Sequence, residues 1–386
     1  MSDKPAPAQP KRSRVVILSA FQDYRTPKRA SIHQVAHALA QDGCDVSFIS
    51  TRFSLISKKK GDSRLFLWDQ ANAWHKVDGV NCYLWRTPLH PFATNNAVAD
   101  AVMAKLFPLF ARLPNADIDG AFQAADYIVI ESSVAAIYID RIKRLNPTAK
   151  IIYYATDRLD TVGAHPYVRR HLVKNARHID HVCLRSTKMV SDFLWAKDRL
   201  YRAEFGIDPA DFETVGPSPY TAQRNAVAVG SMLFDESFFH AVAPQFPDVH
   251  FHVIGCGKSF KGPDNVFVHK EMPFRDTLPY IKHASISISI TPYRLAPGVE
   301  YLAESSLKLG QYENLQILAV CPDFAVGTNP FRAGYVSNDP ASMIAATEKA
   351  LALAGQVPAR HFSTWTEVAD RVLRPENYPD ARIVAD

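Results

Sequence analysis

The 386-residue sequence lacks the features that define several large classes of protein. Its five cysteines are scattered without a CxxC pair, so neither a disulfide scaffold nor a cysteine metal site is indicated, and we expect a reducing compartment. No stretch has the roughly 18 uninterrupted apolar residues of a membrane span, and residues 1–14 lack the apolar core of a signal peptide. We therefore expect a cytosolic protein that is neither secreted nor membrane-spanning.

Three motifs of common enzyme classes are also missing. The sequence has no GxSxG, no GxxxxGK[ST] and no GxGxxG after its first apolar run, which argues against hydrolases, P-loop NTPases and dinucleotide oxidoreductases. The DxD string Asp117–Asp119 lies in a turn-like segment, Pro114–Gly120, that we interpret as a solvated loop. His33 and His37 have helical spacing but no third ligand, so we predict no metal site there and no cofactor.

Apolar, β-rich runs alternate with helix-period segments along the whole chain. A hydrophobic content of 47% is enough for more than one core, and this alternation predicts parallel sheets covered by helices on both faces. The predicted strands are Arg14–Ala20, Asp45–Thr51, Asn81–Arg86, Tyr127–Glu131, Ile151–Thr156, His181–Ser186, Ala226–Gly230, His250–Gly255, Asn265–His269, Ile286–Thr291 and Ile317–Cys321.

The strand pattern restarts after a loop rich in Pro and Gly near 206–220. We therefore predict two α/β, Rossmann-like domains, over 14–205 and 206–361, followed by a helix and tail over 362–386 that could pack back on the first domain. In open sheets of this kind, ligands bind beyond the carboxyl ends of the strands. The active site should therefore lie in a cleft between the two domains.

The two halves differ in charge. Residues 1–205 hold 30 Lys and Arg against 19 Asp and Glu, a net +11, whereas residues 206–386 hold 14 against 20, a net −6. A basic half of this kind suggests an anionic ligand or surface, and no nucleic-acid motif accompanies it. The expected contact face with an anionic membrane surface contains Lys58, Lys59, Lys60, Lys105, Arg112, Val102, Leu106 and Phe110.

Most of those residues belong to Ala97–Leu113, which carries apolar side chains at helical spacing. This segment could dip into a membrane surface or pack in the core, and we expect Pro108 to interrupt the helix. The lysines at 58–60 could equally belong to a solvated loop.

Asp157 directly follows an apolar strand, the position at which α/β sheets present reactive groups. It could act as a general base, or it could simply cap the next helix. In the second half, Ser305 and Ser306 could begin a helix whose free amides, with the ammonium of Lys308, would hold a pyrophosphate. A solvated lysine on a surface helix is the alternative.

Glycines follow two strands of the second half, in Gly230-Ser231-Met232 and Gly255-Cys256-Gly257. Glycine allows the backbone to approach a phosphate or ribose, although it is also common in ordinary turns.

Four segments in order resemble the GumK-like family of bacterial glucuronosyltransferases of xanthan-type exopolysaccharide synthesis. They are Val15–Arg29, Tyr153–Asp160, Gly230–Phe234 and Glu304–Glu313, and the resemblance extends along nearly the whole chain. It implies a GT-B fold and a membrane-associated, inverting enzyme. The implied reaction transfers glucuronate from UDP-glucuronate to a mannose on a polyprenyl-diphosphate-linked oligosaccharide, at the cytoplasmic face of the bacterial inner membrane.

The resemblance also assigns roles to individual residues. Asp157 falls on the position of the base, and Glu271 on that of a ribose-binding carboxylate. The remaining positions that match or flank the nucleotide site are Gly230, Ser231, Met232, Tyr293, Ser305, Ser306, Leu307, Lys308 and Gln311. Leu307 replaces a Met of the family, and Lys28 and Arg29 are candidates for holding the carboxylate of the donor sugar.

Two other functions remain open at this stage. One is a GT-B transferase that uses a different donor, such as UDP-glucose or UDP-N-acetylglucosamine, and the other is a non-catalytic module that binds a nucleotide sugar or lipid. The feature that discriminates between UDP-glucuronate and another donor is a cation placed for the carboxylate of the sugar. The presence of both Asp157 and Lys308 argues against a non-catalytic module.

Overall fold

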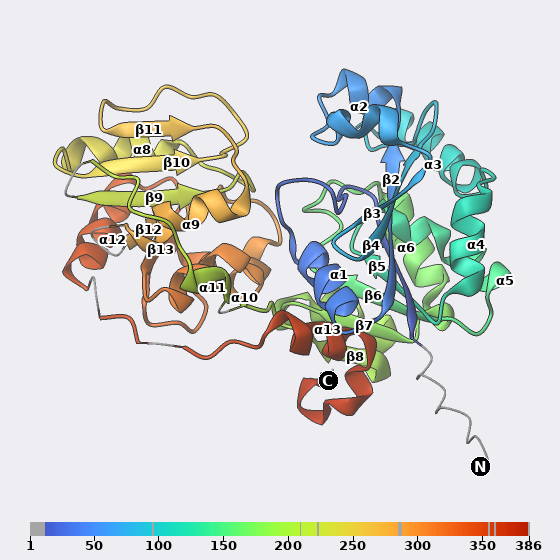
Figure 1. The fold of residues 1–386 in the computed structure, drawn as a ribbon. Coiled ribbons are helices and arrows are strands. Elements are labelled where there is room, and N and C mark those ends of the chain that lie inside the picture. Colours follow the sequence, from blue (N-terminus) through green and yellow to red (C-terminus); the bar gives the residue numbers. More distant parts are fainter. Residues whose placement is uncertain are drawn as a thin grey trace, which may run out of the picture.

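The computed structural model describes residues 12–94, 96–208, 210–221, 224–284, 288–353, 356–358 and 360–384. The chain forms two α/β halves, each built around its own sheet, and the second half lies beside the carboxyl ends of the first sheet (Figure 1).

The first sheet has eight strands in the order β3-β4-β2-β1-β5-β6-β7-β8. All neighbouring strands are parallel except β3 and β4, which form an antiparallel hairpin at one edge. The strands are β1 (Arg14–Ser19), β2 (Asp45–Phe53), β3 (Trp74–Val77), β4 (Val80–Arg86), β5 (Tyr127–Glu131), β6 (Lys150–Ala155), β7 (His181–Leu184) and β8 (Leu200–Arg202).

Helices cover both faces of this sheet because the strands are almost continuously apolar and their successive side chains point to opposite faces. Val15 and Ile17 of β1 pack on one face with α1, whereas Val16 and Leu18 pack on the other with α3 to α6. The helices are α1 (Ser31–Gln41), α2 (Leu55–Lys59), α3 (Ala97–Ala111), α4 (Ala116–Ala124), α5 (Ile139–Leu145) and α6 (Pro166–Lys174).

The second sheet has six strands in the order β11-β10-β9-β12-β13-β14, all parallel. Its strands are β9 (Asn225–Val229), β10 (His250–Ile254), β11 (Val266–His269), β12 (Ile288–Ile290), β13 (Leu318–Pro322) and β14 (Arg332–Tyr335). Its helices are α7 (Ala210–Glu213), α8 (Ser237–Val242), α9 (Phe274–Lys282), α10 (Leu302–Ser305), α11 (Leu307–Asn314) and α12 (Pro340–Ala352).

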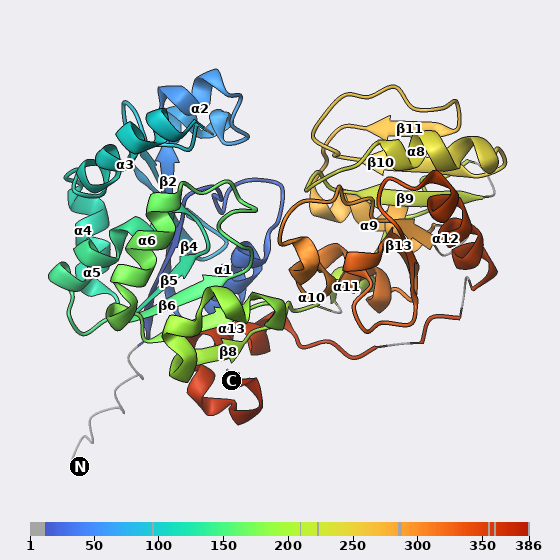
Figure 2. The ribbon, with the colours of Figure 1, turned by 180° about the vertical axis from the view of Figure 1, so that it is seen from behind.

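The chain crosses between the halves twice. After the second sheet it returns to the first half as α13 (Trp365–Leu373), whose apolar residues pack with those of α1 (Figure 2). The two crossings touch, because the rings of Phe205 and Phe362 stack at 5.8 Å and the Ile207 N–H donates to the Ser363 carbonyl. Gly206 fits against the Trp365 backbone, which a Cβ would meet at 2.8 Å.

The predicted strands are observed within two residues at either end, although residues 286 and 287 of the predicted Ile286–Thr291 strand lie outside the described part of the chain. The sequence analysis missed β3, β8 and β14, which are only three or four residues long. Ser306 N-caps α11, so the helix expected from Ser305 begins at Leu307.

Three local predictions are wrong. Pro114–Gly120 is not a solvated loop, because Asn115 caps α4 there and Asp119 pairs with buried Arg141 at 2.7 Å. Pro108 does not interrupt α3, because the burial of Phe107, Phe110 and Ala111 around it outweighs the backbone hydrogen bond that Pro lacks. Phe110 is 5% exposed and stacks on Trp85, so it cannot contact a membrane.

Candidate active site

A cavity of about 320 Å³ lies between the two halves, at the carboxyl ends of both sheets. It is lined by loops that follow β1, β5, β6, β9 and β10, together with the start of α11. All thirteen site residues predicted from sequence line it: Lys28, Arg29, Asp157, Gly230, Ser231, Met232, Glu271, Tyr293, Ser305, Ser306, Leu307, Lys308 and Gln311.

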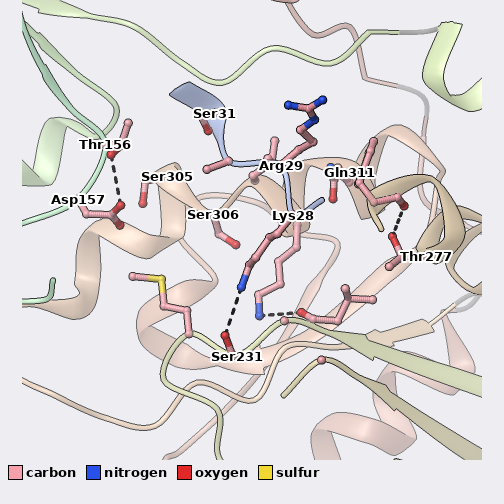
Figure 3. Close-up of a pocket in the computed structure, with 18 of the residues that line it drawn as sticks. Lys28, Arg29, Ser31, Thr156, Asp157, Ser231, Thr277, Ser305, Ser306 and Gln311 are labelled. Carbon is pink, nitrogen blue, oxygen red and sulfur yellow. Dashed lines mark hydrogen bonds between the residues drawn. The ribbon is translucent and has the colours of Figure 1, made fainter. Parts of the chain in front are cut away.

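Asp157 stands on the first half's side of the cavity, two residues after β6 ends. Its N–H donates to Ser132 Oγ at 3.1 Å, its Oδ2 accepts from Thr156 Oγ1 at 3.3 Å (Figure 3), and its Oδ1 accepts from the Tyr301 hydroxyl at 2.9 Å. The next α-helix, α6, is capped by His165. The alternative role of Asp157 as a helix cap is therefore wrong, and its carboxylate faces the cavity.

Glu131, which the sequence analysis did not single out, is a second carboxyl group of the same cavity. It ends β5, beside the strand that leads to Asp157, and it is buried, with Ser19 Oγ donating to its Oε2. Burial, with a smaller contribution from the charge of Asp157, raises the pKa of Glu131 to about 7, and the Ser19 hydrogen bond opposes this rise. The sequence feature that could have identified Glu131 is its position as a carboxylate at the end of an apolar strand.

Lys308 lies on the opposite side, in the first turn of α11. Its Nζ donates to the Val229 carbonyl at 3.1 Å and lies 4.6 Å from the centre of the Tyr293 ring. Burial, with the charge of Lys28, lowers the pKa of Lys308 to about 7. It is therefore no solvated surface lysine, and its ammonium faces the cavity instead.

The start of α11 offers further groups to an anion. Ser306 caps the helix, sharing a 2.7 Å hydrogen bond with the Tyr293 hydroxyl. The buried hydroxyl of Ser305 has no partner among the described residues, although it lines the cavity. Amides, hydroxyls and an ammonium at one helix start form the arrangement that holds phosphate groups.

Glycines allow the loops of the second half to meet here. Gly230 has a φ of +99°, a conformation that side chains rarely adopt. Gly255, at +62°, approaches Glu271 so closely that a Cβ would lie 3.3 Å from its Cα. The Gly-Cys-Gly turn thereby places the Glu271 carboxylate at the cavity.

Lys28 and Arg29 differ in direction (Figure 3). Lys28 crosses from the first half, and its Nζ lies 3.4 Å from Ser231 Oγ and 4.0 Å from Glu271 Oε2. The Arg29 guanidinium points away, donating to the Tyr24 carbonyl and lying 4.0 Å from Asp78. Of the two cations, Lys28 is the one placed to meet a ligand in the cavity.

A second surface of interest lies on the first half, around α2 and α3. Lys58, Lys59, Lys60, Lys105 and Arg112 are exposed, and so are the apolar side chains of Val102 and Leu106, at 57% and 41%. In the described ranges, no helix is long and apolar enough to cross a membrane.

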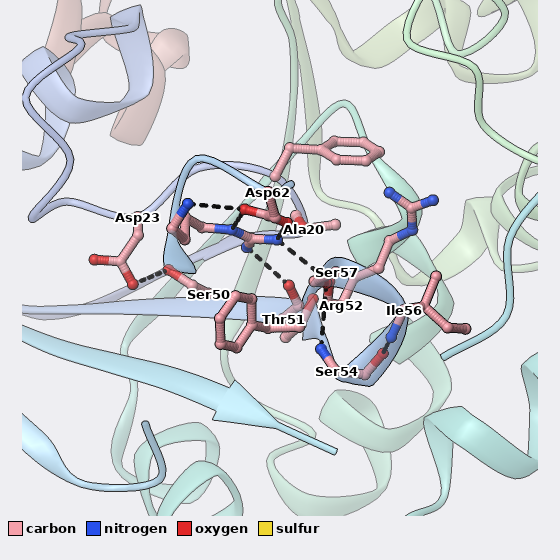
Figure 4. Close-up of polar contacts among 12 residues, drawn as sticks. Ala20, Asp23, Ser50, Thr51, Arg52, Ser54, Ile56, Ser57 and Asp62 are labelled. Atoms are coloured by element: carbon pink, nitrogen blue, oxygen red, sulfur yellow. Dashed lines mark hydrogen bonds and ion pairs between the residues drawn. The ribbon is translucent and has the colours of Figure 1, made fainter. Parts of the chain in front are cut away.

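Buried Arg64 holds the segment that carries Lys58–Lys60 against the end of β2. Its guanidinium pairs with Asp62 at 2.8 Å and donates to the Thr51 carbonyl at 3.1 Å (Figure 4). The lysines are therefore held on an ordered segment beside the end of β2.

Comparison with known proteins identifies a full-length relative. A family model for the N-terminal domain of glucuronosyltransferase GumK matches residues 17–185. The UDP-glucuronate:glycolipid 2-beta-glucuronosyltransferase of Xanthomonas campestris pv. campestris is 40% identical over 387 residues, which cover 99% of this chain and 95% of the relative.

Solved structures share the fold at low sequence identity. The apo structure of OtsA has a TM-score of 0.60 at 12% identity and covers 97% of this chain and 100% of its own. The structure titled "Trehalose-6-phosphate from E. coli bound with UDP-2-fluoro glucose" has a TM-score of 0.54 at 12% identity and covers 93% and 95%. The two-domain fold predicted from sequence, GT-B, is thereby confirmed.

Proposed function

Because this chain belongs to the GumK family of glucuronosyltransferases, we propose that it transfers glucuronate from UDP-glucuronate to a mannose of a polyprenyl-diphosphate-linked oligosaccharide. It is a glycosyltransferase, and its relative acts, by name, on UDP-glucuronate and a glycolipid. The single observation that carries the mechanism is that Asp157 and Lys308, from opposite halves, line one cavity.

The proposed reaction is a direct displacement with inversion. Asp157 takes the proton of the attacking acceptor hydroxyl while the new bond forms at the anomeric carbon of the donor sugar. The bond to UDP breaks on the opposite face, and the charge that develops on the diphosphate meets Lys308 and the start of α11. Asp157 and Lys308 therefore act on opposite sides of one reacting carbon.

The proposed donor site combines the roles implied by the family resemblance with the position of these residues in the same cavity. Glu271 would accept hydrogen bonds from the ribose, while Tyr293, Met232, Leu307 and Gln311 enclose the nucleotide. Lys28, which reaches Ser231 from the first half, would pair with the carboxylate of the glucuronate. That cation favours UDP-glucuronate over neutral UDP-sugars.

We further propose that no divalent metal is needed, because Lys308, Lys28 and helix amides supply the positive charge. The enzyme would work in exopolysaccharide synthesis at the cytoplasmic face of the inner membrane, where its basic half meets an anionic leaflet.

One assay tests the function. Purified enzyme is incubated with UDP-glucuronate, UDP-glucose or UDP-N-acetylglucosamine, with and without a lipid-linked mannosyl acceptor, and UDP release is measured. We expect acceptor-dependent release with UDP-glucuronate alone, unaffected by EDTA. Preference for a neutral donor would contradict the role of Lys28, and loss of activity in EDTA that Mg²⁺ restores would contradict metal independence.

A further inference from the structure

We propose that Tyr301 is a positioning residue for the reaction: carried by the donor-binding half, it holds the Asp157 carboxylate of the other half in its reactive orientation. This inference rests on the proposed role of Asp157 as the base. Tyr301 ends a 3₁₀ helix, Val299–Tyr301, and its hydroxyl donates to Asp157 Oδ1 at 2.9 Å across the cavity boundary.

The two oxygens of Asp157 have unequal partners. Oδ1 has the short hydrogen bond from Tyr301, whereas the contact of Oδ2 within the described part of the chain is the 3.3 Å one from Thr156. Tyr301 therefore fixes the carboxylate through one oxygen and leaves the other to accept the proton of the acceptor. The side chain is 1% exposed, and burial raises its pKa, so the hydroxyl stays protonated and remains a donor.

The loop that brings Tyr301 to Asp157 requires a glycine at position 298. Gly298, with a φ of +71°, lies against Arg158, the neighbour of Asp157. A Cβ at Gly298 would lie 2.6 Å from Arg158 Nη1. Arg158 is in turn held by Asp192 at 2.8 Å, so the glycine allows the Tyr301 loop to dock on an ordered surface.

The same short segment also forms the donor site. Three residues beyond Tyr301, Glu304 accepts hydrogen bonds from the N–H and the hydroxyl of Thr187 at 2.8 and 3.0 Å. Ser306 and Lys308 then line the nucleotide side of the cavity. Residues 301–308 thus contact the base, the first half and the proposed donor site in sequence, so the docking of the two halves that forms the cavity also places Tyr301 against the base.

The substitution Tyr301→Phe removes the hydroxyl and keeps the ring. We expect kcat to fall about tenfold, the effect of losing one hydrogen bond to a charged group, while the KM for UDP-glucuronate and the Kd for UDP change less than twofold. Tyr335→Phe is the matched control, because the Tyr335 hydroxyl is buried without a partner among the described residues. It should leave kcat unchanged.

A double-mutant cycle separates positioning from a structural effect. Asp157→Asn alone should lower turnover by about 10² or more. Adding Tyr301→Phe should then cause no further loss, because Tyr301 acts through the base. An additive further loss, or normal kcat in Tyr301→Phe alone, would overturn the inference. Near-normal turnover in Asp157→Asn would instead overturn the proposed base itself.

Discussion

In the proposed mechanism Lys308 binds UDP as a cation, yet its partly buried position disfavours the charge. Its pKa is lowered to about 7 by burial and by Lys28. Above pH 7.5 the phosphates of UDP no longer titrate, since their last pKa is about 6. Any proton that is taken up when UDP binds above pH 7.5 therefore reports the protonation of Lys308.

We expect UDP to bind more weakly as pH rises from 7.5 to 9, by at most tenfold per unit, with uptake of about one proton. Calorimetry in two buffers of different ionisation enthalpy measures this uptake. Lys28→Met removes a repelling charge, so the fall in affinity should begin at higher pH. Heats that do not depend on the buffer would show that Lys308 is charged before UDP arrives.

Glu131 is a buried acid whose protonation should govern stability. With its pKa raised from 4.5 to about 7, the folded state binds more protons than the unfolded state between those values, so this group's contribution to stability falls as pH rises through them. The loss approaches roughly 3 kcal/mol above pH 7.

Glu131→Gln keeps an acceptor for Ser19 but cannot ionise. Relative to the native protein, the variant should therefore gain about 2–3 kcal/mol of stability between pH 5 and pH 8, measured by urea unfolding at both values. Parallel pH dependence of the two proteins would mean that Glu131 is already ionised at neutral pH.

At the scale of an element, α3 carries an apolar face that the protein leaves exposed. Val102 and Leu106 face solvent, whereas Phe110 packs on Trp85. The double variant Val102→Ser, Leu106→Ser should bind anionic vesicles several-fold more weakly in co-sedimentation, without a loss of stability.

The matched control is Leu295→Ser, Val336→Ser, which removes comparable exposed side chains from the second half. It should bind vesicles like the native protein, and binding by both should fall with added salt. If both double variants bind equally well, the membrane contact lies elsewhere. Phe110→Ser is no test of docking, since it should cost about 3–5 kcal/mol of stability.

At the scale of the whole molecule, the placement of the halves depends on close packing near the crossings. Gly310 of α11 contacts the ring of Phe205, which a Cβ would meet at 2.1 Å. Because α11 also carries Lys308, displacing it from Phe205 should disturb the donor site more than either core.

We expect Gly310→Ala to raise the KM for the UDP-sugar several-fold and to increase the radius of gyration in solution scattering, at a cost of roughly 1–3 kcal/mol. Gly120→Ala is the control and should change neither quantity, because on α4 the added Cβ would have no described atom within 4 Å. An unchanged KM in Gly310→Ala would show that Phe205 simply moves aside.

The sequence by itself determined most of the elements and predicted a set of site residues that line one cavity. Continuous apolar runs such as Ile151–Ala155 can be buried on both faces only as strands of a covered parallel sheet, and the Asp that follows must then lie at the carboxyl edge. Matching motifs in order predicted a nucleotide side as well, and all those residues line one cavity.

Only the tertiary structure decided which groups meet and which side chains are buried. Periodicity assigns a residue to a face but does not say what covers it, which is why Phe110 was expected at the surface and the environment of Lys308 stayed open. Tyr301 reaches Asp157 from 144 residues away, through the docking of two separately folded sheets. No local pattern encodes such a contact, because it depends on the packing of both halves at once.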